Sequence, residues 1–147
     1  MNNILKNKNV LITGATGGVG RELCLQFKEQ GLNLFITSKD IDKLQVLGEE
    51  LECEYIETNF NTGIKELTSH VRNTIGTIDV LVNCAGIFIS DNLNELTDED
   101  FDKIFNVNVK APFLLMKEFS KDMKKQKWGR IITVSYTHLT LPTTPYV

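Results

Sequence analysis

The sequence predicts an α/β fold built on a doubly wound parallel sheet. Short apolar runs typical of strands alternate five times with stretches in which apolar residues recur at helical spacing, and the connections between them are short. The first apolar run, residues 10–12, leads directly into a cluster of four glycines, and a helical pattern follows. Because parallel strands are joined by right-handed crossovers, we expect helices on both faces of the sheet.

Each predicted element has its own local signal. The first helix, from about residue 19 to 30, ends before Gly31, which suits the left-handed position after a helix. Asp40 and Thr97 are suited to cap the N-termini of two later helices. The second strand, residues 32–37, is mostly apolar, as in a strand covered on both faces. Further strands are expected at 55–58, 79–83 and 130–134, and further helices after Asp40, at 64–75 and from about 97 onward.

The composition indicates one domain without an extended charged surface. Sixteen Lys and Arg against nineteen Asp and Glu give a net charge of -3 over 147 residues, so no basic field favours nucleic acid or a membrane. The three cysteines are about thirty residues apart, a spacing that suggests neither a metal site nor a disulfide framework. The sequence has no apolar leader or membrane-spanning run, so we expect a cytoplasmic protein with no metal, nucleic-acid or membrane partner.

The glycine cluster after the first strand is a candidate anion site. A side chain at Gly14 or Gly18 would hold the backbone away from a pyrophosphate, and one at Gly20 would push the helix off the strand beneath it. Without these side chains, the first free N–H groups of the helix and its positive end can face an anion. The alternative is a tight turn with no ligand.

Small or polar residues follow the other strands. Ligands of open parallel sheets bind beyond the carboxyl ends of the strands, so these residues are expected around one crevice. Ala85 and Gly86 are small enough for a ligand to lie against the backbone, and the Asn83 amide can tie neighbouring strand ends together. A capped turn without a ligand is the alternative there. The residues expected at the crevice, besides the glycine cluster, are Ser38, Lys39, Asn59, Phe60, Asn83, Ala85 and Gly86.

Asn108 is the unusual position of the long helix that begins near Thr97. It falls within an apolar stripe, where an unpaired amide costs about 1–3 kcal/mol, so we expect a buried amide with partners. Pro112, four residues later, has no N–H, which leaves the Asn108 carbonyl free to bind a water or ligand in the crevice. The alternative is a proline kink with a satisfied core Asn.

Four motifs resemble those of the short-chain dehydrogenase/reductase family. Residues 13–20 (TGATGGVG) are similar to its T-G-x-x-x-G-x-G fingerprint, and residues 83–86 (NCAG) to its N-N-A-G motif with the second Asn replaced. Residues 106–109 (NVNV) resemble the helix segment that carries a catalytic Asn, here Asn108. Residues 129–134 (GRIITV) resemble the strand that leads to its catalytic Ser.

The resemblance covers nearly all of residues 8–134. The glycine cluster also fits the T-G-x-x-G-x-x-G pattern of the extended, nucleotide-sugar branch of the family. The NCAG motif and Asn108 favour the ordinary branch instead, with 3-oxoacyl-acyl-carrier-protein reductases as the nearest type.

The resemblance implies a Rossmann domain over residues 1–134, with strand order 3-2-1-4-5 and later strands missing. It implies an NAD(P)-dependent oxidoreductase that transfers hydride between the nicotinamide and a small-molecule carbonyl or alcohol, and a homodimer or homotetramer for the full-length protein. In this family a Tyr is the general acid/base, a Lys four residues later lowers its pKa, and a Ser steadies the substrate oxygen. The carbonyl of the catalytic Asn, here Asn108, holds a relay water.

The resemblance also implies where the cofactor binds. An acidic residue after the second strand would accept the adenosine ribose hydroxyls and repel a 2′-phosphate, but Ser38 and Lys39 stand there, which favours NADP(H) over NAD(H). Gly17 occupies a position where many relatives that use NADPH carry a second basic residue. Asn59 and Phe60 are expected to flank the adenine. The implied cofactor-binding residues are Thr13, Gly14, Thr16, Gly18, Val19, Gly20, Ser38, Lys39, Asn59, Phe60, Asn83, Ala85 and Gly86.

The family pattern ends at Val134. The catalytic Ser would fall at Tyr136, and no Tyr-x-x-x-Lys follows. Residues 135–143 can be encoded as TCT TAT ACA CAT CTG ACG CTG CCG ACG, which resembles a transposase-type sequencing adapter read as codons. We therefore expect residues 135–147 to be a non-native or disordered tail and the chain to be an inactive fragment. A real, divergent C-terminus is the alternative.

Two other functions stay open at this point. A nucleotide-sensing Rossmann module would bind NADP(H) without catalysis, and a purely structural α/β domain would not bind it. A Ser, a Tyr and a Lys further along the intact gene would indicate the enzyme.

Overall fold

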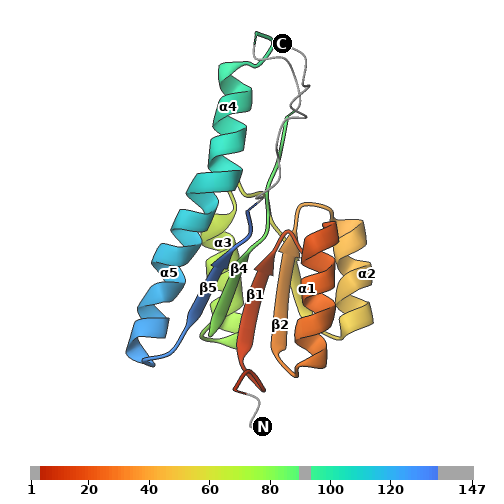
Figure 1. Cartoon of the computed structure of the whole chain (residues 1–147), viewed down its shortest axis with the longest axis vertical. Coiled ribbons are helices and arrows are strands. Elements are labelled where there is room, and N and C mark those ends of the chain that lie inside the picture. Colours follow the sequence, from red (N-terminus) through yellow and green to blue (C-terminus); the bar gives the residue numbers. More distant parts are fainter. Residues whose placement is uncertain (1–3, 90–93, 136–147) are drawn as a thin grey trace, which may run out of the picture.

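Five parallel strands form the centre of the computed structural model, which describes residues 4–89 and 94–135 (Figure 1). They lie in the order β3-β2-β1-β4-β5, so the predicted fold class and strand order are confirmed. Crossovers through helices make all the strands parallel, so their carboxyl ends lie at one edge of the sheet. The strands are β1 (Asn9–Thr13), β2 (Asn33–Ser38), β3 (Glu54–Glu57), β4 (Val80–Asn83) and β5 (Arg130–Thr133).

Helices cover both faces of the sheet. Figure 1 shows α1 (Gly18–Glu29) and α2 (Ile41–Leu51) on one side, and α3 (Ile64–Ile75) and α5 (Ala111–Lys125) on the other. Alternate side chains of each central strand point to opposite faces, so Val10 and Ile12 pack with α1 and α2, whereas Leu11 packs with α3 and α5. The sheet therefore separates two apolar cores.

The predicted helix ends are confirmed. Gly31 follows α1 with a φ of 78°, a left-handed conformation that favours glycine. Asp40 caps α2 by accepting a hydrogen bond from Lys43 N at 3.2 Å. Thr97 and Asp100 form a reciprocal capping box at the start of α4 (Asp98–Phe105).

The long helix contains a π-turn just before Pro112. Residues Asn106–Lys110, labelled η1, form this turn between α4 and α5, and Ala111 N–H donates to Asn106 O, five residues back. Pro112, which has no N–H to donate, follows this turn directly as the second residue of α5. Figure 1 shows α4 extending beyond the carboxyl edge of the sheet. The predicted stripe is accordingly buried only in part: Phe101 and Phe105 are exposed, and Leu115 and Phe119 are buried.

β5 is an edge strand, and all four of its residues are exposed. Ser135 is the last described residue of this part of the chain, so the assignment of residues 135–147 to a tail lies almost entirely outside the described residues. Within the described ranges, no helix combines the length and the apolar character needed to cross a lipid bilayer.

Candidate functional site

A cleft of about 400 Å³ lies at the carboxyl edge of the sheet, where the structure brings the glycine turn, the end of β2 and the segment after β4 together. The prediction that these strand ends face one crevice is confirmed. The predicted residues that line the cleft are Gly14, Thr16, Gly18, Val19, Gly20, Ser38, Lys39, Phe60, Ala85 and Gly86. Gly17, of the glycine cluster, and Cys84, of the turn at 83–86, also line the cleft, as do Ile87 and Val134, which the sequence did not predict there.

A hollow of about 350 Å³ adjoins this cleft and shares Lys39, Phe60 and Ile87 with it. Asn59 lines the hollow and does not line the main cleft. Its side-chain oxygen accepts a hydrogen bond from Asn61 N at 3.0 Å, which stabilises the turn after β3. Because they share three lining residues, the two spaces adjoin one another, and the hollow reaches the end of β3.

Three of the four glycines in the cluster, Gly14, Gly18 and Gly20, are required or allowed for different structural reasons. Gly14 has a φ of 67°, and a Cβ there would lie 2.7 Å from the main chain of Ala85, so packing against the segment after β4 requires glycine. Packing against Ala85 is thus a reason for glycine at position 14 besides the expected approach of a ligand, and Gly14 also lines the cleft. A Cβ at Gly20 would overlap the carbonyl oxygen of Gly14, as expected for close helix–strand packing. A Cβ at Gly18 would meet nothing within 4 Å, so Gly18 borders open space.

The N-terminus of α1 presents main-chain donors to the cleft. Arg21 N donates to Gly17 O at 2.8 Å, so the N–H groups of Gly18, Val19 and Gly20 precede this bond. Gly17 supplies no side-chain cap, and the first turn contains no acidic residue. These N–H groups and the positive end of the helix favour an anionic ligand.

Thr13 and Asn83 lie beneath the cleft, buried, and hold the strand ends in place. Thr13 Oγ1 accepts hydrogen bonds from Cys84 N and Ala85 N, both at 3.1 Å. Asn83 Nδ2 donates to Thr133 Oγ1 at 3.4 Å, which confirms the predicted tie between neighbouring strand ends. Neither residue lines the cleft. Asn83 Oδ1 is buried and has no hydrogen-bond partner among the described residues, so an acceptor stays available below the cleft.

The end of β2 offers a hydroxyl and a cation. Ser38 is buried, and its Oγ lies 2.6 Å from Thr16 Oγ1, which joins the glycine turn to β2. Lys39 is exposed and lines both the cleft and the adjoining hollow. The nearby Asp40 is engaged by Lys43, and the hydrogen bond from the Lys43 side chain lowers the pKa of its carboxyl. Positive charge at this end of the cleft therefore comes from Lys39.

Asn108 is exposed, so the expectation of a buried Asn is wrong. A buried Asn108 follows from the apolar periodicity only if the helix is regular and packs against the sheet. Asn108 instead lies in the π-turn, next to the part of the helix that leaves the sheet. Its amide does have partners: Oδ1 accepts from Ile87 N, and Nδ2 donates to Ile87 O, each at 2.9 Å. Asn108 thereby fixes the segment that forms one wall of the cleft.

The cysteines do not supply a nucleophile. Cys84 lines the cleft, and burial raises the pKa of its thiol. Burial likewise raises the pKa of Cys24 to about 12 and that of Cys53 to about 11. Thiols with raised pKa values are unreactive near neutral pH.

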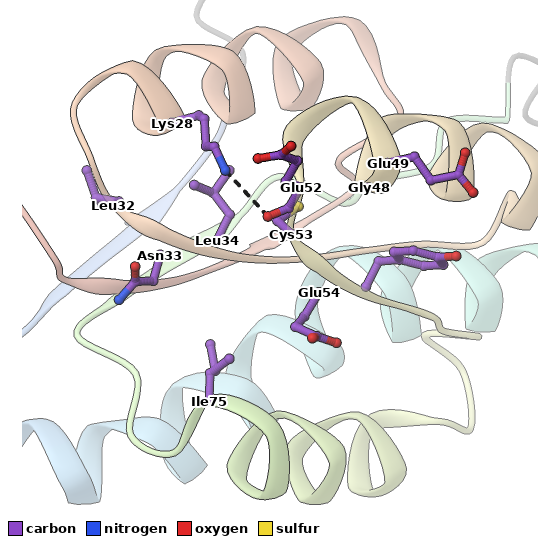
Figure 2. Close-up of a pocket in the computed structure, with 11 residues that line it drawn as sticks. Lys28, Leu32, Asn33, Leu34, Gly48, Glu49, Glu52, Cys53, Glu54 and Ile75 are labelled. Atoms are coloured by element: carbon purple, nitrogen blue, oxygen red, sulfur yellow. Dashed lines mark hydrogen bonds between the residues drawn. The ribbon is translucent and has the colours of Figure 1, made fainter.

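A second cavity, of about 440 Å³, lies at the opposite end of the sheet (Figure 2). Glu49, Glu52 and Glu54 line it, and Figure 2 shows Lys28 donating to the main-chain oxygen of Glu52, at 3.4 Å. This acidic lining disfavours an anion, whereas the cleft at the carboxyl edge has helix N–H groups and Lys39. The donor set of that cleft fits the phosphates of a dinucleotide.

Comparisons with known proteins agree with this fit. The sequence model described as short chain dehydrogenase matches residues 8–143, a span that continues past Val134. The chain is 36% identical over 128 residues to the 3-oxoacyl-acyl-carrier-protein reductase FabG of Rickettsia typhi, covering 87% of this chain and 53% of the relative. The chain thus spans about half the length of the curated relatives it matches.

Two solved structures share the fold. A metagenomic short-chain oxidoreductase in complex with NADP has a TM-score of 0.83 and 28% identity, with 89% of this chain and 63% of the other covered. A blue fluorescent protein from a metagenomic library, in complex with NADPH, has a TM-score of 0.83 and 26% identity, with 90% and 57% covered.

Proposed function

Because the chain belongs to the short chain dehydrogenase family, we propose that it is the cofactor-binding part of an NADP-dependent oxidoreductase. The full-length protein would transfer hydride between the nicotinamide and a small-molecule carbonyl or alcohol. One observation carries the proposal: the uncapped N-terminus of α1 opens into a cleft beside Ser38 and Lys39, at the carboxyl edge of a parallel sheet.

Different residues of the described chain would bind different parts of the cofactor. The N–H groups of Gly18, Val19 and Gly20 would hold the diphosphate, because their donors precede the first helical hydrogen bond. Ala85 and Gly86 leave the backbone open for close approach of the ligand. Thr13 and Asn83 act from beneath by fixing the strand ends.

The adenosine end supports NADP(H) rather than NAD(H). Ser38 and Lys39 stand where an acidic residue would repel a 2′-phosphate, and the Lys39 ammonium is exposed to the cleft. Asn59 and Phe60, in the adjoining hollow, would flank the adenine. The two structural neighbours named above are complexes with NADP or NADPH.

Asn108 is proposed to serve the reaction through its main chain. Its side chain is engaged by Ile87, so the main-chain carbonyl is the group proposed to hold a water, and Pro112, four residues later, has no N–H to donate to it. The bound nicotinamide would supply or accept the hydride. The general acid/base Tyr and its Lys are not found after Val134, so the 147-residue chain is proposed to be inactive as it stands.

Recovery of the complete gene from intact DNA tests the proposal. A reading frame that continues from Val134 to a Ser and a Tyr-x-x-x-Lys, with NADPH oxidation by the full-length protein on addition of a carbonyl substrate such as a 3-oxoacyl thioester, is the expected result. A complete gene without these residues whose product still binds NADPH would favour the sensing module instead. Absence of NADPH binding would leave a purely structural domain.

A further inference from the structure

We infer that Arg21 is a second cation for the 2′-phosphate of NADP(H), held by Glu50 in the hollow between α1 and α2 until the phosphate binds. This inference rests on the proposed function and adds a residue that determines cofactor preference. Lys39 supplies one cation at the end of β2, whereas Gly17, on the facing turn, has no side chain that could supply a second one.

Arg21 lines a hollow that continues the cleft. This hollow, of about 390 Å³, lies between α1 and α2, and Thr16 lines both it and the cleft. Thr16 Oγ1 is also 2.6 Å from Ser38 Oγ, at the end of β2. A phosphate held near Ser38 would therefore lie at the junction of the two spaces. The hollow is lined by Thr16, Arg21, Asp42, Lys43, Val46, Leu47 and Glu50.

The position of Arg21 on α1 suits this role. Residues four apart lie on the same face of a helix, so Arg21 stands one turn below Gly17 and on the same side. The guanidinium now binds Glu50, in the last turn of α2, but the side chain can turn toward the N-terminus of α1, because Gly17 places no side chain above it. A guanidinium on this long stem can thus replace the basic group that Gly17 lacks.

The present partner of Arg21 is easily exchanged. Its guanidinium donates to both carboxylate oxygens of Glu50 at 2.8 Å, but the two side chains are 49% and 43% exposed. Exposed ion pairs of this kind contribute little, whereas a phosphate dianion offers a stronger bidentate acceptor. Lys43, the other cation of the hollow, is bound to Asp40 at 2.8 Å. What distinguishes Arg21 from Lys43 is its place one turn from Gly17 on α1 and its planar guanidinium, which can bind two phosphate oxygens at once.

Two substitutions that break the same ion pair test the inference. The affinities of the 147-residue chain for NADPH and NADH are measured by calorimetric titration for the unchanged chain, Arg21→Gln and Glu50→Gln. Arg21→Gln is expected to weaken NADPH binding about tenfold and leave NADH binding unchanged, because only NADPH carries the 2′-phosphate. Glu50→Gln releases Arg21 and is expected to strengthen NADPH binding.

Lys28→Gln is the matched control. Lys28 is on the same helix and its loss changes the net charge equally, but it lies at the other end of the sheet (Figure 2). The ratio of NADPH to NADH affinity should not change in this variant. Melting curves of all three variants verify that each is folded, as expected for exposed positions.

The outcomes separate the inference from the proposed function. Opposite effects of Arg21→Gln and Glu50→Gln on NADPH affinity support the inference. If both variants keep the NADPH to NADH ratio of the unchanged chain, the pair is only a link between helices and the inference fails, although the proposed function stands. If the unchanged chain binds neither dinucleotide, both fail.

Discussion

Asn108 and Ile87 exchange two hydrogen bonds, each of 2.9 Å: Ile87 N–H donates to Asn108 Oδ1, and Asn108 Nδ2 donates to Ile87 O. The first residue lies in the π-turn of the long helix and the second in the segment after β4, which lines the cleft. A single side-chain amide thus mimics the pairing of a neighbouring strand. The helix thereby determines where one wall of the cleft lies.

Replacing Asn108 with Ala should loosen this wall. Both hydrogen bonds disappear, and because the site is exposed we expect a loss of about 1 kcal/mol in the free energy of unfolding. Amide hydrogen exchange at Ile87 should accelerate. Asn106→Ala, on the same π-turn, is the matched control and should leave this exchange rate unchanged. Unaltered exchange at Ile87 in the Asn108 variant would show that the bonds do not hold the segment.

Thr13→Val should destabilise the chain far more than Thr13→Ser. Valine has the shape of threonine but cannot accept the hydrogen bonds from Cys84 N and Ala85 N, and we expect a cost of about 2 kcal/mol. Serine keeps the accepting hydroxyl. Chemical denaturation of the two variants measures the difference. Equal midpoints would mean that the hydroxyl does not connect β1 to the segment after β4.

Gly20→Ala should mainly lower the stability of the chain, and Gly18→Ala should mainly weaken its binding of NADPH. An alanine at 20 overlaps Gly14 O, so a loss of about 3 kcal/mol or more in unfolding free energy is expected. An alanine at 18 has free space, and thermal unfolding should be nearly unchanged while NADPH binding weakens, because the methyl group projects toward the bound diphosphate. Unweakened NADPH binding by a folded Gly18→Ala chain would place the phosphates elsewhere.

The cleft illustrates what the sequence could predict. Its position followed from the alternation of strands and helices, since parallel strands bring their carboxyl ends to one edge whatever the details of packing. The caps at Asp40 and Thr97 were also predictable, because capping depends on neighbouring residues only. The need for glycine at position 20 was predictable as well, because it depends only on the packing of the helix against the turn that precedes it.

Features that depend on distant parts of the chain were not predictable in this way. The close approach of Ala85 to Gly14 brings together the turns that follow two different strands. No residue near Gly14 in the sequence indicates this contact. Asn108 was expected in the core because helical periodicity assumes a regular helix, whereas the π-turn shifts the phase by one residue. The ion pair of Arg21 with Glu50 likewise requires the packing of α1 beside α2.

Stability should depend on pH through Glu118. The hydrogen bond from Arg72, and to a smaller extent the one from Lys121, lowers the pKa of its carboxyl from 4.5 to about 2. A carboxyl whose pKa is lower in the folded state stabilises the fold above its ordinary pKa, and this contribution is lost as the pH falls from about 4.5 toward 2.

Glu118→Gln measures that contribution. Because the pair is partly exposed, we expect the variant to be about 1 kcal/mol less stable than the unchanged chain at pH 7, with the difference shrinking to nothing toward pH 2. Glu29→Gln, at the exposed end of α1, controls for the loss of one negative charge. A difference that is independent of pH would rule out the link between α3 and α5 as its source.

The binding of the cofactor diphosphate by the glycine turn is tested most directly by NMR. The main-chain amide signals of the ¹⁵N-labelled chain are followed during titration with NADPH. We expect saturable shifts that are largest for the N–H groups of Gly18, Val19 and Gly20, at the start of α1. Binding that leaves these three signals unmoved, or no binding at all, would contradict it.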